Sequence, residues 1–140
     1  MPKTLASSRV YFENASGRVT EHPEGFAVIT WHKGPRRLED FKAILNHLDR
    51  LLRLRNWSKL LADQQLMTPF TPEETAWVMH DWLPRAVGEG PYRYAAVILP
   101  LDVFARLSSQ NVLSESQKKF VAYRYCADAA EAAQWLRPLA

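Results

Sequence analysis

The chain has 140 residues, of which 47% are hydrophobic and 24% are charged, and these values are typical of one globular domain spanning residues 1–140. A domain of this length buries enough surface to fold without a disulfide or a structural metal, and the single cysteine excludes a disulfide framework. The net charge of +3 is too small to indicate nucleic-acid binding by itself.

The first part of the chain contains three short stretches rich in β-branched and aromatic residues, with Gly or Pro in the turns between them. These stretches are Val10–Glu13, Arg18–Glu21 and Phe26–Trp31. This pattern predicts antiparallel hairpins.

The next segment changes to a helical period. Apolar residues recur at spacings of three and four from Leu38 to Leu52, which predicts an amphipathic helix of about five turns. Trp57–Asp63 follows and predicts a short buried strand.

A second helix is expected to begin at Thr71, because Pro72 suits the first turn and Glu74 completes a capping box. Pro84 lies inside this helix and has no backbone N–H to donate. We therefore expect a kink or break near Leu83.

One face of this second helix is expected to pack on the sheet, and Gly88 and Gly90 are expected to end the helix in the left-handed conformation. Asp81 and Arg85 can pair at the i, i+4 spacing. The apolar residues of the packing face are Val78, Met79, Trp82, Leu83 and Ala86.

The most apolar run, Tyr92–Leu99, predicts a strand covered on both faces, and we expect it to be the central one. Asp102 is expected to cap a helix that ends near Val112. The segment Ser114–Lys119 is then predicted to be a polar loop.

Phe120–Cys126 predicts the last strand, and Asp128 with Glu131 predicts a capping box that opens the last helix. Strands that alternate with helices imply parallel β-α-β units. The expected fold is α/β, with a mixed sheet of about five or six strands, antiparallel in its N-terminal part and parallel in the remainder, and about four helices.

The sequence offers little catalytic or metal-binding chemistry. Its glycines and histidines lack the spacings of phosphate loops and zinc sites. His80 and Asp81 are neighbours that point about 100° apart on a helix, so they cannot form an orienting pair. Cys126 is expected to be a small buried hydrophobe. We therefore predict no catalytic residue, no metal and no cofactor.

Asp63 ends a buried strand at its carboxyl end, where open α/β sheets gather ligands. Two interpretations stay open: a ligand-binding carboxylate, or a carboxylate satisfied by backbone N–H groups of the following turn. A general base at Asp63 or His32 is a further alternative, because a fold does not exclude an activity.

A basic segment holds the whole charge excess of the chain. Between Lys33 and Arg55 there are seven Lys or Arg and three Asp or Glu, whereas the rest holds eleven and twelve. Arg36 and Arg37 precede a helix N-terminus, where positive charge is unfavourable unless an anion joins it. The anion is either the acidic first turn of that helix or a small ligand bound with Lys33, Trp31 and Asp63. Aromatic residues for stacking on bases are missing from the segment, so nucleic acid is not expected.

Five segments together carry a family resemblance: Trp31–Gly34, Leu60–Asp63, Trp82–Ala86, Ala96–Pro100 and Ala133–Leu136. They resemble the STAS-like domains, and more narrowly small stand-alone proteins of that kind from Bacteroidetes-type bacteria. The resemblance covers nearly the whole chain from about Val10 and implies a non-enzymatic, regulatory module that binds partner proteins. In the anti-sigma-factor antagonists of this family, a serine near the start of the second helix is phosphorylated.

The matching region, residues 63–71, contains no serine and no Asp-Ser-x-Gly motif. Its only hydroxyl groups belong to Thr68 and Thr71, and both suit capping roles.

Two functional hypotheses follow. The first is a module that binds a protein partner, or a second copy of itself, through the surface around the second helix, with Phe70, Trp77, Asp81 and Arg85 as interface residues. The second is a sensor for a small anionic ligand at the carboxyl edge of the sheet. Because the sequence has no signal peptide and no apolar run long enough to cross a bilayer, and one cysteine, we expect a cytoplasmic location.

Overall fold

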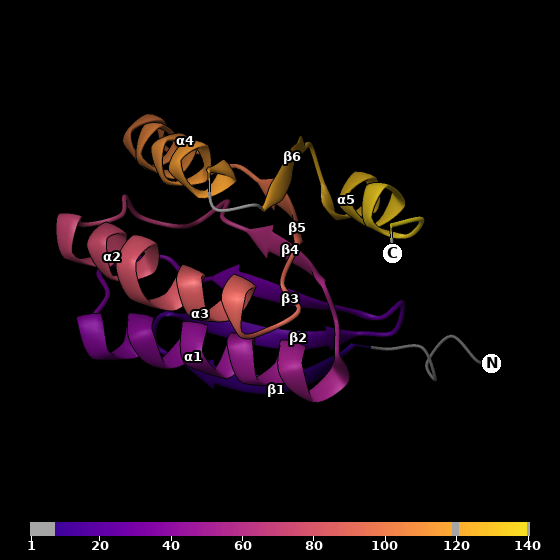
Figure 1. The fold of residues 1–140 in the computed structure, drawn as a ribbon. Helices are drawn as coiled ribbons and strands as arrows, with labels where there is room; N and C mark the ends of the chain where they lie inside the picture. Colours follow the sequence, from indigo (N-terminus) through magenta and orange to yellow (C-terminus); the bar gives the residue numbers. More distant parts are fainter. Residues whose placement is uncertain (1–7, 119–120, 140) are drawn as a thin grey trace.

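The computed structural model describes residues 8–118 and 121–139 and forms one six-stranded sheet with helices on both faces (Figure 1). The first three strands are antiparallel to their neighbours, and the third to sixth are parallel. The strands lie side by side in chain order: β1 (Arg9–Asn14), β2 (Gly17–His22), β3 (Phe26–Trp31), β4 (Lys59–Asp63), β5 (Tyr94–Ile98) and β6 (Ala122–Cys126). The expected α/β fold with a mixed sheet is confirmed.

Three helical segments cover one face of the sheet and a single helix covers part of the other (Figure 1). The first face carries α1, the continuous helix from α2 to α3, and α4, and the second carries α5. The helical elements are α1 (Leu38–Arg55), α2 (Pro72–Trp77), the π-helical turn η2 (Val78–Trp82), α3 (Leu83–Gly88), α4 (Val103–Gln117) and α5 (Ala129–Leu136).

Alternation along the strands divides the core into two parts. On β3, Ala27, Ile29 and Trp31 belong to the larger core under α1 to α4, whereas Phe26 belongs to the smaller core under α5, with Val28 packed against it. This follows from the two-residue period of a strand, which sends successive side chains to opposite faces.

The prediction that the most apolar strand is central is wrong. β5 is buried on both faces as expected, but it lies next to the edge strand β6, and β3 and β4 are in the middle of the sheet. Each parallel crossover adds its strand on the same side of the previous one, so the sheet order follows the chain order. An apolar strand requires cover on both faces, which α4 and α5 supply here, and this requirement does not depend on a central position.

Of the kink or break predicted near Leu83, the break is wrong, because the chain remains helical from Pro72 to Gly88. The helix is nevertheless irregular there, since a π-helical turn ends directly before Leu83. The turn η2 is widened, with the N–H of Leu83 donating to the carbonyl of Val78, five residues earlier. A π-turn accommodates an irregularity within a helix without ending it, and Pro84 follows directly. The predicted packing face is confirmed, because all five of its apolar residues are buried.

Gly88 and Gly90 do not take left-handed backbone angles, contrary to the prediction, since the positive-φ glycines of the described chain are Gly25 and Gly34. Gly90 is instead required by a close approach. A Cβ atom there would lie 2.9 Å from the carbonyl oxygen of Ala86. The glycine therefore lets the chain turn tightly beneath the end of α3.

Helix α4 is longer than predicted. Asp102 caps it as expected, its carboxylate accepting from the N–H of Ala105 at 2.8 Å, but the helix continues to Gln117. The prediction of a loop at Ser114–Lys119 is therefore wrong for residues 114–117, which are helical. Residues 119 and 120 lie outside the described chain, and β6 begins at Ala122.

The last capping box forms in part. The side chain of Asp128 accepts from the N–H of Glu131 at 2.9 Å. The Glu131 carboxylate reaches the N–H of Ala127 at 3.1 Å, one residue before the cap. The capping box at Thr71 and Glu74 is complete.

Helix α1 ends at Asn56, which has a φ of 56° and donates its N–H to the carbonyls of Leu52 and Arg53. Left-handed backbone costs an ordinary residue about 1–2 kcal/mol and is tolerated by Gly and Asn. We predict that Asn56→Gly leaves the free energy of unfolding unchanged or raises it, whereas Asn56→Val lowers it by about 1–2 kcal/mol. Urea denaturation measures both, and equal stabilities of the two variants would contradict the assignment.

Candidate functional site

The carboxyl ends of the parallel strands β3, β4 and β5 meet at one edge of the sheet, on the left in Figure 1. Two adjoining hollows of about 320 Å³ and about 220 Å³ lie there and share Leu66 and Leu101 in their walls. Lys33 lines the larger hollow, and Asp63 and Trp31 line the smaller one. Three of the predicted ligand-binding residues therefore reach this edge.

The Asp63 carboxylate is held by the turn that follows it. Its Oδ1 accepts from both the backbone N–H and the side-chain Nε2 of Gln65, each at 3.1 Å. These contacts agree with one of the two interpretations of Asp63 from the sequence, a carboxylate that accepts hydrogen bonds from the following turn. Trp31 is a core residue, stacked on Phe41 with ring centroids 5.4 Å apart.

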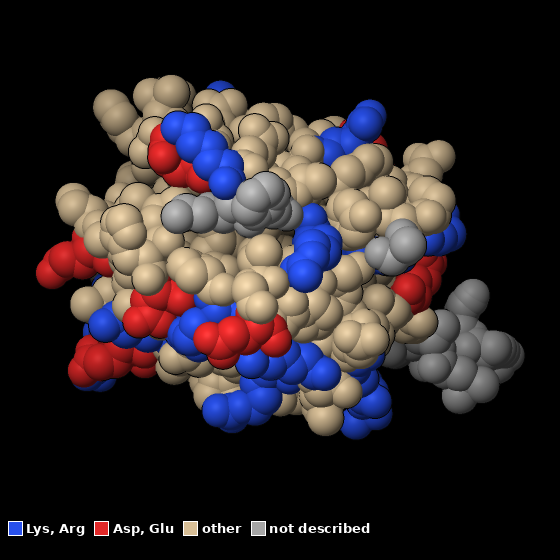
Figure 2. Space-filling model, viewed as in Figure 1, with Lys and Arg blue, Asp and Glu red and all other residues tan. Residues whose placement is uncertain are grey.

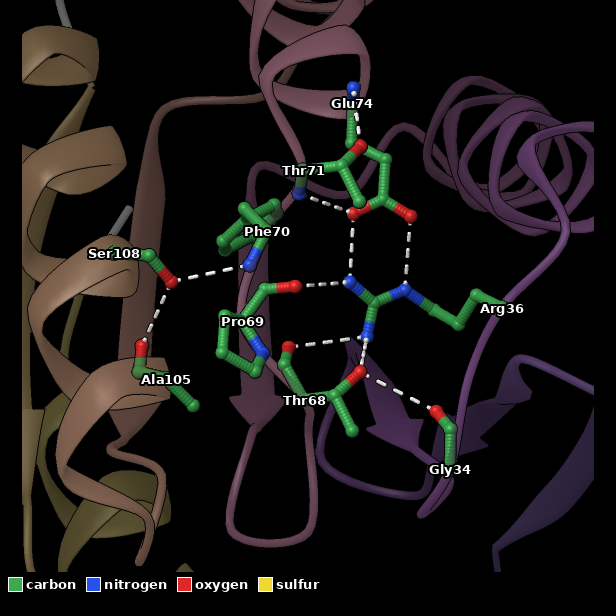
Figure 3. A network of polar contacts seen from close by, with 9 residues as sticks. All are labelled: Gly34, Arg36, Thr68, Pro69, Phe70, Thr71, Glu74, Ala105 and Ser108. Atoms are coloured by element: carbon green, nitrogen blue, oxygen red, sulfur yellow. Dashed lines mark hydrogen bonds and ion pairs between the residues drawn. The ribbon is translucent and has the colours of Figure 1, made fainter.

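Arg36 lies in the interior and not at the surface where a ligand would bind. Its side chain and that of Glu74 are both only 2% exposed, and they form a bidentate ion pair (Figure 3). The Nε–Oε2 distance is 3.0 Å and the Nη2–Oε1 distance is 2.6 Å. The remaining donors reach the carbonyl and hydroxyl of Thr68 and the carbonyl of Pro69. This guanidinium has no donor left for an external anion, so Arg36 does not fit its predicted role.

The ion pair ties three segments together (Figure 3). The Glu74 carboxylate also accepts from the N–H of Thr71 at 3.0 Å, and the hydroxyl of Thr68 donates to the carbonyl of Gly34 at 3.3 Å. The loop before α1, the loop after β4 and the first turn of α2 are thus fixed to one another. Thr71 caps α2 as predicted, whereas Thr68 serves this network and is not a cap.

Arg37 lies in solvent and pairs with Glu39 at 3.1 Å, with both side chains 74% exposed. The acidic first turn of α1 therefore neutralises this cation, which was the first interpretation of the basic segment. The second hypothesis, an anionic ligand at the carboxyl edge, stays a prediction and retains Lys33 and Arg37 as its cations.

The predicted interface residues Phe70 and Trp77 are half-buried and pack edge-on against Phe41, at centroid distances of 6.0 and 6.2 Å. Asp81 and Arg85 form the expected pair at 2.8 Å. These four residues serve the packing of the second helix against α1 at least in part. Their role in binding a partner stays a prediction.

Among residues 8–118 and 121–139, the largest cluster of exposed apolar side chains lies elsewhere and was not predicted. Its members lie on the loop after β4, the loop after β5 and the first turns of α4, and each is more than half exposed. We call this cluster the α4 apolar surface; it consists of Leu66, Leu101, Val103, Phe104 and Leu107. Phe104 is 73% exposed and Leu107 is 60% exposed. Clustered exposure of this kind marks interaction sites, whereas single exposed apolar residues are ordinary.

The amphipathicity of α4 is reversed in its N-terminal half. The side buried against the rest of the protein carries Ala105 and Ser109, whereas Phe104 and Leu107 face solvent. In Figure 2, most charged side chains of this face gather over its lower half, where α1 lies in Figure 1, and none is visible at the left end of α4 in this view. The sequence shows the spacing of apolar residues at 103, 104 and 107, but this spacing predicts a buried helix face equally well.

A cavity of about 70 Å³ lies between the sheet and the helices that cover it. Its walls include Leu60 and Ala62 of β4, Trp82 of η2 and Leu113 of α4. The cavity is largely apolar and exceeds the volume that one water molecule needs. Ala62 of the central strand β4 contributes one of the small side chains in its wall.

Tyr92, which is buried, and Tyr123, which is partly buried, lie beside this cavity. Burial raises the pKa of Tyr92 well above its ordinary value. Burial also raises the pKa of Tyr123 to about 12, although hydrogen bonds with Ser116 and Tyr92 act in the opposite direction. Both phenols are therefore neutral and connect β6 with α4 and the start of β5.

The other candidate groups have structural partners. His32 contacts the Glu13 carboxylate at 3.0 Å, and burial raises the pKa of the Cys126 thiol. Within residues 8–118 and 121–139, no three His, Cys, Asp or Glu side chains converge as metal ligands would. In the same part of the chain, no helix combines the length and apolar character needed to cross a bilayer.

Comparison of the chain with protein-family models, with curated proteins and with solved structures finds no match. The proposed function below therefore rests on the geometry of the chain and on the resemblance found in its sequence.

The buried ion pair gives a stability prediction. Arg36→Met leaves the Glu74 charge buried without a partner, and we expect a loss of about 3–5 kcal/mol in the free energy of unfolding. The double variant Arg36→Met/Glu74→Gln should lose less, because Gln keeps the capping box and removes the charge. Arg37→Met, at the exposed neighbour, should change stability by less than about 0.5 kcal/mol. Similar losses for Arg36→Met and Arg37→Met in urea denaturation would contradict the burial of Arg36.

The cavity gives a second prediction, which compares two alanines on opposite faces of the sheet. Ala62 borders the cavity, whereas Ala96 is fully buried in the core under α5. Ala62→Val should keep or raise the melting temperature because it fills empty space, and Ala96→Val should cost about 1–3 kcal/mol through overpacking. Equal destabilisation of both variants in thermal unfolding would show that the cavity is not empty space.

Proposed function

We propose that this chain is a non-enzymatic STAS-like module that binds a protein through the α4 apolar surface. The observation that carries the proposal is the exposure of Phe104 and Leu107 beside Leu66 and Leu101, while small residues of the same helix are buried. Exposure of clustered large apolar side chains to water is unfavourable, and their burial by a partner lowers the free energy of the complex.

The fold supports this proposal. The STAS-like resemblance implies a mixed sheet with helices packed on it, and the sheet of this chain is mixed and carries helices on both faces. The groups considered as general bases also have structural partners, since Asp63 is bound by Gln65 and His32 by Glu13. A regulatory role in the cytoplasm completes the proposal and rests on the resemblance and on the single cysteine.

The proposed interface differs from the one predicted around Trp77, but the two surfaces adjoin. The N–H of Phe70 donates to the hydroxyl of Ser108 on α4 at 3.1 Å (Figure 3). Phe70 therefore connects the second helix with the helix that carries Phe104. A partner seated on the α4 apolar surface is in a position to contact Phe70 at its rim.

Photocrosslinking tests the proposal. A benzophenone amino acid replaces Phe104 in the full chain, and the same amino acid replaces Gln134, an exposed residue of α5 on the opposite face of the sheet, as the matched control. We expect a discrete crosslinked protein adduct from position 104 in cells and none from position 134, because only the first position lies in an apolar contact. Identical adduct patterns from both positions, or no adduct from position 104, would refute the proposed function.

A further inference from the structure

We infer that the α4 apolar surface binds a second copy of this chain, so that two α4 helices pack across a twofold axis. This inference rests on the proposed function and names the partner. Three observations carry it: the area of the surface, the charge of its rim and the position of Phe104 within it.

The area is sufficient for a symmetric pair. A large apolar side chain presents about 150–200 Å² when fully exposed, and five of them at somewhat more than half exposure present on the order of 500 Å². This is near the upper limit of one patch on a stable monomer. Two copies in contact remove roughly 1,000 Å² of apolar surface, the lower bound for a specific interface.

The rim of the surface has both signs of charge in balance. Lys33 and Asp102 line the larger hollow beside Leu101, and Asp63 lines the smaller one. Arg106 lies on α4, with its guanidinium donating to the carbonyls of Pro100 and Leu101 at 3.2 and 3.3 Å. Two cations and two anions thus lie beside the part of the patch formed by Leu66 and Leu101.

A rim with balanced charges favours a second copy of the chain over a strongly charged partner or a membrane surface. In a twofold interface the same patch meets itself, so a rim of one sign would repel its own copy. A strongly charged partner would instead be matched by a rim of the opposite sign, and a membrane-binding helix would carry an excess of Lys and Arg beside its apolar face. Lys33 and Arg106 are offset by Asp63 and Asp102, so neither pattern is present on this rim.

Phe104 is placed to lie close to the twofold axis. It is the most exposed residue of the patch at 73%, and it lies three residues from Leu101 on one side and from Leu107 on the other. In a symmetric interface a residue at the centre of the patch faces its own copy. The charge at position 104 therefore determines whether two identical chains can approach.

Sedimentation velocity over a range of protein concentrations tests the inference with the wild-type chain and three variants. The wild-type chain should show a monomer–dimer equilibrium with a Kd on the order of 10 μM, as expected for an interface at the lower size limit. Phe104→Glu and Phe104→Arg should each weaken the dimer about 30-fold or more. An equimolar mixture of these two variants should form dimers again, because opposite charges then meet at the axis.

Leu54→Glu is the matched control, because Leu54 is also an apolar residue more than half exposed, on α1, and its substitution should leave the Kd unchanged. Circular dichroism and thermal unfolding check that each variant is folded, as expected for substitutions at exposed positions. A wild-type chain that stays monomeric up to about 1 mM, or a dimer equally affected by Phe104→Glu and Leu54→Glu, would overturn the inference.

The crosslinking experiment separates failure of this inference from failure of the proposed function. A monomeric wild-type chain whose position 104 crosslinks to a different protein refutes self-association and leaves the protein-binding function in place. A monomeric chain without any adduct at position 104 refutes both. A dimer that is insensitive to Phe104→Glu places the contact between copies on another surface and overturns the inference alone.

Discussion

The orientation of α4 is the constraint on which the functional account depends, and polar contacts set it. Ser109 is fully buried and its hydroxyl donates to the side-chain carbonyl of Gln64, a buried residue directly after β4. A buried hydroxyl or amide without a partner costs free energy, so rotation of the helix away from this bond is unfavourable. Because Ser109 must face inward, Phe104 and Leu107 must face outward. The reversed amphipathicity of the N-terminal half of α4 thus follows from the buried hydrogen bond between Ser109 and Gln64.

The Arg36–Glu74 ion pair gives the same edge of the sheet its rigidity. It joins the loop before α1 to the loop after β4, and Leu66 of the second loop belongs to the α4 apolar surface. A buried ion pair contributes little net stability compared with an apolar pair, but removal of one partner is costly, so it specifies one arrangement of the loops. A surface held in one arrangement before binding loses less conformational entropy when a partner covers it.

The sequence predicted the helices, strands and mixed sheet because periodicity and capping are local signals. The five-turn helix α1 and the caps at Thr71 and Asp102 were found in this way. The continuation of the second helix through Pro84 was not, since a π-turn has no recognisable pattern in a single sequence. The site was less predictable for a related reason: whether Arg36 is buried, or which side of α4 faces the sheet, depends on residues more than thirty positions away, such as Glu74 and Gln64.

The most direct measurement of the central claim is the rate of thiol labelling of single cysteines on α4, in a Cys126→Ala background and in dilute solution. Cysteines at positions 104 and 107 should react at the rate of a free, exposed thiol. Cysteines at positions 105 and 112, both buried on the inner side of α4, should react at least about 100-fold more slowly, because they become accessible only when the structure opens locally. Fast labelling at positions 105 and 112 with protection at 104 and 107 would show that α4 faces the other way, and the docking surface would then not exist.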